Sequence, residues 1–154
     1  MFGWRLGLPV VAVDTAKGFV PALLGAILVG KGTGVLAGGA AMLGHWRPLF
    51  LRWRRGGKMV ATCGGAFLGV APIVGGIGAG VWLGTFLLLR YASVASMAAA
   101  LAVPGVAVLL GEPWPVIAFA AAAAVAVIFL HRGNIARLRA GTESRFRFRR
   151  PASV

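Results

Sequence analysis

Long apolar runs separated by short breaks are the feature that most constrains how this chain can fold. Glycine, proline or charged residues occupy each break, and such residues end helices. Hydrophobic residues make up 59% of the 154 residues and charged residues 12%, which leaves too little polar surface for a water-soluble domain. The sequence therefore predicts an all-α, polytopic transmembrane helix bundle of about six spans, forming a single domain over residues 1–154. The six runs are 8–29, 35–51, 59–71, 73–89, 94–110 and 116–130.

The third run is short for a membrane crossing, which takes about 20 residues in a perpendicular helix. A half-helix, or a helix extended by its flanks, would fit residues 59–71. The chain has 24 glycines. Small residues let transmembrane helices pack backbone against backbone, so the runs are expected to form a bundle rather than isolated anchors.

The positive charge is distributed unevenly along the chain. Lys and Arg number 16 against three acidic residues. If the six spans alternate, Arg5, the cations between 52 and 58, Arg90 and the arginines from 132 onward share one side, and Lys31 lies on the other. Under the positive-inside rule both termini are expected in the cytoplasm. The basic tail, 141–154, would either lie along the anionic inner leaflet or act as a plain topology anchor.

The scarcity of acidic and metal-binding residues excludes several chemistries. The acids are Asp14, Glu112 and Glu143 alone, so a paired-carboxylate site is not expected. The histidine and cysteine spacings form no metal cage, and the single Cys63 cannot form a disulfide within the chain. The cations lie between apolar runs, so no nucleic-acid partner is expected. The chemistry that remains compatible with the sequence is electrostatic binding of phosphate, with a histidine as a possible proton acceptor. No metal or cofactor is expected.

Asp14 and Lys17 lie three residues apart within the first apolar run. A lone charge at that depth costs roughly 2.5 to 3.5 kcal/mol, so both need a partner. Their spacing favours a structural ion pair, and contact with a substrate is the alternative.

Two further segments place histidine beside concentrated positive charge. Gly56-Gly57-Lys58 precedes an apolar run and could offer backbone N–H groups and an ammonium to an anion, with His45 shortly upstream. It is not a Walker loop, and a simple basic turn is the competing interpretation. At the end of the last run, His131 and Asn134 share a helical stripe with Arg137 beside it, and Gly141 is expected to stop the helix. One anionic ligand shared by both segments would explain this pattern.

These stretches resemble one family, the bacterial acyl-phosphate:glycerol-3-phosphate acyltransferases of the inner membrane. HRGNIARLRAGTE at 131–143 is similar to the family's C-terminal motif nearly position for position. GHWRPLFLRWRRGGKMVAT at 44–62 resembles its central glycerol-phosphate-binding motif, and DTAKG at 14–18 and RYASVAS at 90–96 add weaker support. Met59 differs from the family, which usually has glycine after the lysine.

The resemblance implies seven spans in the family, of which this chain is expected to lack the first together with its Gly-Ser-Gly-Asn motif. It implies transfer of a fatty acyl group from acyl phosphate to the 1-hydroxyl of glycerol 3-phosphate, giving lysophosphatidate for phospholipid synthesis without acyl-CoA. Two alternatives stay open: a truncated, inactive homologue with a structural or binding role, and a small transporter.

The resemblance also assigns roles to individual residues. His131 and Asn134 would line the reacting centre, and Glu143 would order the end of its motif rather than take part in the chemistry. The residues expected to bind substrate are His45, Gly56, Gly57, Lys58, Thr62 and Arg137.

Overall fold

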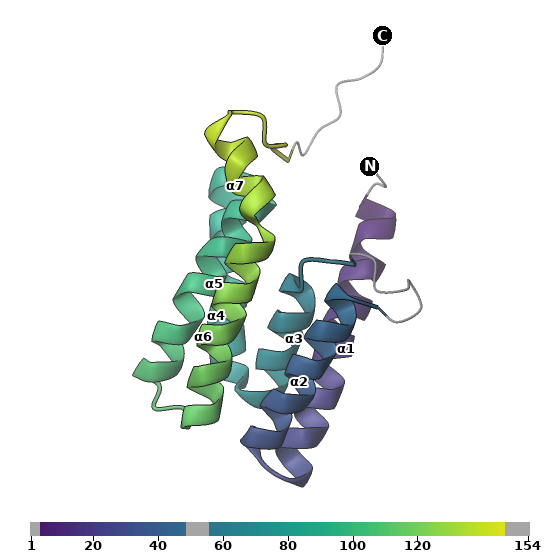
Figure 1. Ribbon diagram of the computed structural model, residues 1–154, viewed down its shortest axis with the longest axis vertical. Coiled ribbons are helices and arrows are strands. Elements are labelled where there is room, and N and C mark those ends of the chain that lie inside the picture. The colour runs from purple at the N-terminus through teal and green to yellow at the C-terminus, as the bar shows by residue number, and fades with distance from the viewer. Residues whose placement is uncertain (1–3, 49–55, 147–154) are drawn as a thin grey trace.

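The computed structural model describes residues 4–48 and 56–146, and all of its regular secondary structure within them is α-helical (Figure 1). Each of the six predicted runs forms a helix, which confirms the all-α bundle. A seventh, short helix follows the last run after a bend. The helices are α1 (Trp4–Leu28), α2 (Lys31–Trp46), α3 (Val60–Val70), α4 (Pro72–Leu89), α5 (Ala92–Leu109), α6 (Trp114–Leu130) and α7 (Arg132–Arg139).

The helices form two groups that stand side by side (Figure 1). Helices α1, α2 and α3 pack together, α4 packs on α5 and α5 on α6, while α3–α4 and α2–α6 contacts join the groups. The start of α1, the end of α2, the start of α3 and α7 all lie toward one end of the molecule. The α1–α2 and α5–α6 turns lie at the opposite end.

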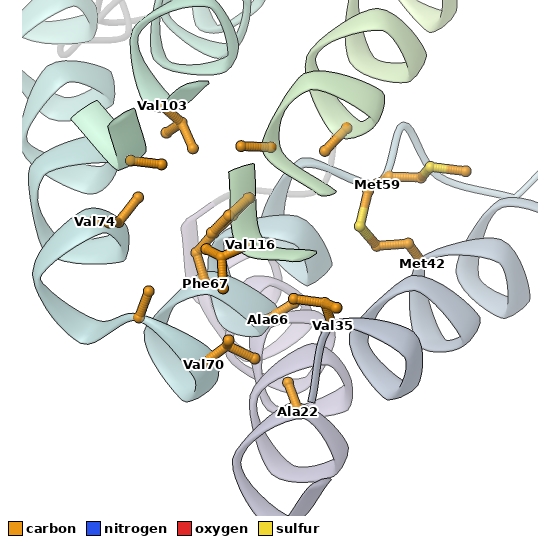
Figure 2. Packing of buried hydrophobic residues seen from close by; sticks show 14 residues of the cluster. Ala22, Val35, Met42, Met59, Ala66, Phe67, Val70, Val74, Val103 and Val116 are labelled. Carbon is orange, nitrogen blue, oxygen red and sulfur yellow. The ribbon is translucent and has the colours of Figure 1, made fainter. Parts of the chain in front are cut away.

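Buried apolar side chains from both groups meet in one cluster (Figure 2). Phe67 of α3 lies near its centre, where its ring is 5.0 Å from that of Phe119. Large apolar side chains also face outward, and Leu109, for example, is 86% exposed. A bundle that is apolar on both its inner and outer surfaces is suited to a lipid environment.

Glycine lets α1 and α3 approach backbone to backbone. A Cβ atom added at Gly18 would overlap the carbonyl of Thr62, and one added at Gly65 would overlap the carbonyl of Thr15. Any larger residue at these two positions would force the helices apart. This contact is the close helix packing that the glycine content predicted.

Length separates the helices that can cross a membrane from those that are too short. Among the described helices, three are long and apolar enough: α1 from Gly7 to Leu28, α4 and α5. A fourth results if α6 and α7 count as one span bent by 52°. Helix α3 has 11 residues and ends where Pro72 begins α4, and α2 has 16 and ends just before Pro48. The number of full spans by this measure is therefore smaller than the six predicted.

Gly141 ends α7, as the sequence predicted. Its φ of 69° lies in the left-handed region that glycine tolerates best. The N–H of Thr142 donates to the carbonyl of Arg137 at 2.8 Å, and that of Gly141 donates to Leu138 at 3.1 Å. These two hydrogen bonds form a Schellman cap, which turns the chain back toward the bundle.

Candidate functional site

A chain of side-chain hydrogen bonds connects the two helix groups at the end of the molecule that carries α7. The Lys58 ammonium, just before α3, donates to Oδ1 of Asn134 on α7 at 2.8 Å. The amide nitrogen of Asn134 then donates to Oε1 of Glu143 at 2.6 Å. The structure therefore brings together Lys58 and Asn134, which are 76 residues apart in the sequence.

Glu143 accepts hydrogen bonds from three side chains. Ser93 donates to Oε1 at 2.7 Å, Asn134 donates to the same oxygen, and Arg137 donates to Oε2 at 2.7 Å. Burial by itself would raise the pKa of Glu143, but these hydrogen bonds and the charge of Arg137 outweigh it and lower the pKa to about 2. Glu143 is therefore a fixed carboxylate at neutral pH and not a proton donor.

The Lys58 ammonium group is partly buried beside α7. This desolvation lowers its pKa below the usual 10.5, while the negative charge of Glu143 raises it and the positive charge of Arg137 lowers it further. Its direct partner is a neutral amide, so its charge is not cancelled by contact with a carboxylate. The ammonium is thus placed to attract an anion.

His131 lies at the bend between α6 and α7 and is 2% exposed. Its Nδ1 is 2.8 Å from the carbonyl oxygen of Val127. That oxygen can only accept a hydrogen bond, so Nδ1 carries the proton in the neutral ring and Nε2 is the unprotonated nitrogen. The same carbonyl also accepts the backbone N–H of His131 at 3.0 Å, so both hydrogen bonds hold His131 against the last turn of α6.

The Gly-Gly-Lys segment is held against the end of α2. The N–H of Gly56 donates to the carbonyl of Trp46 at 2.9 Å, and that of Gly57 donates to the carbonyl of His45 at 3.3 Å. A Cβ atom at Gly57 would overlap the His45 ring. The two backbone amides are therefore engaged with α2, whereas the sequence suggested that they face an anion. They anchor the loop that carries Lys58.

Asp14 lies between two basic side chains. Its Oδ1 is 3.2 Å from the Lys17 ammonium and 3.4 Å from Nδ1 of His45. The Lys17 side chain is 56% exposed and that of Asp14 is 18% exposed. Asp14 and Lys17 thus contact each other, and through His45 they support the loop at Gly57.

Two separate cavities have lining residues near this end of the bundle. A polar one, of about 370 Å³, is lined by Lys58 and by residues on both sides of the bend, including Arg132, Asn134 and Arg137. An apolar one, of about 400 Å³, lies between the helix groups and is lined by residues of α1, α3, α4, α5 and α6. Three cationic groups and an amide around one space suit a phosphate.

The same two chain segments contribute to both cavities. Lys58 lines the polar cavity, while Val60 and Ala61 line the apolar one. In α6, Leu130 lines the polar cavity and Val127 the apolar one. Because these residues are only two or three positions apart, a ligand with a polar head and an apolar chain could occupy both cavities at once.

Thr62 is not among the residues that line the polar cavity. It is fully buried where α1 crosses α3, against Gly18. The structure therefore places Thr62 in helix packing.

The family model of glycerol-3-phosphate acyltransferases matches residues 1–141. The chain belongs to this family. It is 41% identical to the glycerol-3-phosphate acyltransferase of Desulforudis audaxviator over 148 residues, covering 96% of this chain and 73% of that protein. It is 46% identical to the Roseiflexus sp. enzyme of the same name over 139 residues, covering 86% and 68%.

Solved structures agree with this assignment. A crystal structure of PlsY (YgiH), an integral membrane glycerol 3-phosphate acyltransferase in its glycerol 3-phosphate form, superposes with a TM-score of 0.90 at 37% identity and covers 95% of this chain and 74% of that one. Its lysophosphatidic acid form gives a TM-score of 0.88 at 37% identity, covering 93% and 74%. This glycerol-3-phosphate acyltransferase family member is therefore a membrane-integral protein.

Two residues of this candidate site were not among those proposed from the sequence. Arg132 lines the polar cavity. Its position next to His131, within the 131–143 motif, is the sequence feature that could have identified it. Ser93 binds Glu143 from α5. It lies within the RYASVAS stretch, but a serine in an apolar run gives no sign of a partner 50 residues away.

Proposed function

We propose that this protein transfers a fatty acyl group from acyl phosphate to the 1-hydroxyl of glycerol 3-phosphate, giving lysophosphatidate and inorganic phosphate. The observation that carries the proposal is a pair of cavities, one basic and one apolar, lined by neighbouring residues at the start of α3 and the end of α6. The family assignment and the likeness to PlsY forms with glycerol 3-phosphate and lysophosphatidic acid support the same substrates.

The polar cavity is the proposed site for phosphate. Lys58, Arg132 and Arg137 supply positive charge, and charge-assisted hydrogen bonds to phosphate are among the strongest that proteins make. Gly56 and Gly57 act by anchoring the loop, and His45 acts by packing on that loop. Asn134 reaches the cavity between Lys58 and Arg137, so it is placed near the reacting groups.

The apolar cavity is the proposed site for the acyl chain. Its lining is almost wholly apolar, and it lies between helices that would be surrounded by lipid. With the acyl chain in this cavity and the phosphate of glycerol 3-phosphate in the polar one, the acyl carbonyl would lie between the two. The acceptor hydroxyl would reach the same place from the cytoplasmic end.

In the proposed reaction, the 1-hydroxyl oxygen attacks the acyl carbonyl carbon and the bond from that carbon to the phosphate oxygen breaks. Negative charge grows on the carbonyl oxygen and on the leaving phosphate, and the fixed cations stabilise both. The hydroxyl proton passes to Nε2 of His131 or to a phosphate oxygen. Replacing His131 with Asn separates these two routes, because the amide can still donate to Val127 but cannot accept the proton.

The proposed setting is the bacterial inner membrane, with the α7 end of the bundle facing the cytoplasm. In the described residues this end carries Lys58, Arg90 and the arginines of α7, whereas the opposite end carries Lys31. That imbalance follows the positive-inside rule. A reporter fused after residue 154 should be cytoplasmic and one inserted near Gly34 external. The reverse result would overturn the orientation.

The direct test is glycerol-3-phosphate-dependent release of phosphate from acyl phosphate by purified protein in detergent, with lysophosphatidate identified by mass spectrometry. Because the matched relatives are longer, the assay is run on this chain and on a version extended with the family's first helix and motif. Transfer from acyl phosphate but not from acyl-CoA supports the proposal. Transfer from acyl-CoA alone, or no lysophosphatidate from either version, contradicts it.

A further inference from the structure

The carboxylate of Glu143 connects two helices through its hydrogen bonds. Asn134 and Arg137, two of its three donors, belong to α7, which immediately precedes Glu143 in the chain. The third, Ser93, is the second residue of α5 and comes from a distant part of the sequence. Ser93 is 6% exposed, so water does not readily replace its hydrogen bond. The position at the start of α5 also suits a carboxylate, because the helix dipole is positive there.

Glu143 determines which way the Asn134 amide points. The amide nitrogen donates to Glu143 and the amide oxygen accepts from Lys58. If the amide were reversed, its N–H groups would face the Lys58 ammonium and its oxygen would face the Glu143 carboxylate. Both contacts would be repulsive, so Glu143 and Lys58 together hold the amide oxygen toward Lys58, and Glu143 also fixes the position of the amide nitrogen.

We infer that Ser93 is a positioning residue for the phosphate site: it fixes the Glu143 carboxylate, which orients Asn134, which in turn places the Lys58 ammonium. This inference rests on the proposed function, because it assumes that Lys58 binds substrate phosphate. Ser93 itself lines neither cavity and touches no reacting group.

Loss of the Ser93 hydroxyl should leave the surrounding fold intact. Other contacts hold the chain after α7 on the α4–α5 turn: the N–H of Phe146 donates to the carbonyl of Arg90 at 2.8 Å, and Nε of Arg145 donates to that of Leu89 at 3.2 Å. The Phe146 ring also lies 5.4 Å from that of Phe86. The effect of Ser93→Ala should therefore be confined to Glu143 and the groups it orients.

The test measures KM for glycerol 3-phosphate, kcat and thermal stability for Ser93→Ala, Ser93→Thr and Ser144→Ala. We expect Ser93→Ala to raise KM about five- to tenfold, the size of one hydrogen bond, with a smaller change in kcat. Ser93→Thr keeps the hydroxyl and should restore KM. Ser144 is exposed and adjacent to Glu143, so its substitution is the matched control and should change nothing.

A double-mutant cycle with Glu143→Ala, which removes the acceptor of the Ser93 hydrogen bond, separates positioning from simple packing. If Ser93 acts through the Glu143 side chain, Ser93→Ala should have little further effect on KM in the Glu143→Ala background. An equal effect in both backgrounds, or an unchanged KM in Ser93→Ala alone, overturns the inference. Lys58→Ala is measured in parallel: if it leaves KM unchanged, the proposed phosphate site is wrong, and that failure is distinguishable from a failure of Ser93 alone.

Discussion

Two lysines, one at each end of the bundle, both connect the two helix groups but have different partners. The Lys31 ammonium, at the start of α2, lies 2.6 Å from a carboxylate oxygen of Glu112 in the α5–α6 turn. The Lys58 ammonium, before α3, donates instead to the neutral amide of Asn134. The first charge is neutralised by direct contact, whereas the second keeps its attraction for an anion. The comparison distinguishes a structural lysine from one suited to bind a ligand.

The largest expected difference between the two lysines is in substrate use. Lys58→Ala should lower kcat/KM for glycerol 3-phosphate about ten- to a hundredfold, chiefly through KM, because a hydrogen bond to a charged group contributes about 1.5 to 3 kcal/mol. Lys31→Ala is the matched control and should leave KM unchanged. A large fall in kcat at constant KM would instead assign Lys58 to the leaving phosphate.

The second prediction concerns the Glu143 carboxylate, which is connected to Lys58 through Asn134. The pKa of Glu143 is lowered from 4.5 to about 2 in the folded protein, so its stabilising effect is complete above about pH 4.5 and is lost as the pH falls toward 2. Wild-type protein should therefore melt a few degrees above Glu143→Gln at pH 6. Thermal scans from pH 6 to 2.5 should show the difference in melting temperature between the two proteins becoming smaller. A difference that stays constant would mean that Glu143 is not ionised in the folded protein.

A third prediction uses the ionisation of Lys58. Its pKa is lowered by desolvation, so the charged form that binds phosphate is lost at a lower pH than for an ordinary lysine. The alkaline fall in kcat/KM for glycerol 3-phosphate reports this ionisation in the free enzyme. In Lys58→Arg the guanidinium stays charged, so the fall should move to higher pH. If kcat/KM fell at the same alkaline pH in wild type and in Lys58→Arg, a group other than Lys58 would control that fall.

The smallest effect is expected at the other end of the bundle. Breaking the Lys31–Glu112 pair by Glu112→Gln should cost about 0.2 to 1 kcal/mol of stability, because one of the two side chains is substantially exposed. The double variant Lys31→Glu with Glu112→Lys should recover part of that loss in thermal unfolding. Activity should be unchanged throughout. A rise in KM would show that this end influences the phosphate site, and the distinction between the lysines would then fail.

Much of the fold could be predicted because it depends on local pattern. The apolar runs predicted the six helices α1 to α6, and Gly141 predicted the end of α7 through its freedom to adopt positive φ. The seventh helix was not separated from the last run. Nothing in the spacing of His131 indicates a 52° bend there, since the bend depends on what α7 packs against.

The structure explains how Met59 can replace the glycine that is usual in the family. It stands where the resembling family usually has glycine, and its φ of 65° is in the region that glycine favours. The side chain is 4% exposed and packs in the apolar cluster with Met42 (Figure 2). Burial of this large side chain offsets the unfavourable backbone conformation. The sequence identified the position, but only the packing explains why methionine is tolerated.

The sequence by itself determined the membrane class, the helices, the uneven charge and the residue types able to bind phosphate, because these follow from composition and from periodicity along the chain. The tertiary structure decided which of those residues meet. It joined Lys58, just before α3, to Asn134 of α7, Glu143 after α7 and Ser93 of α5, and it turned the amides of Gly56 and Gly57 toward α2. Hydrogen bonds of this kind depend on how helices pack, and helix packing is set by contacts between residues far apart in the chain.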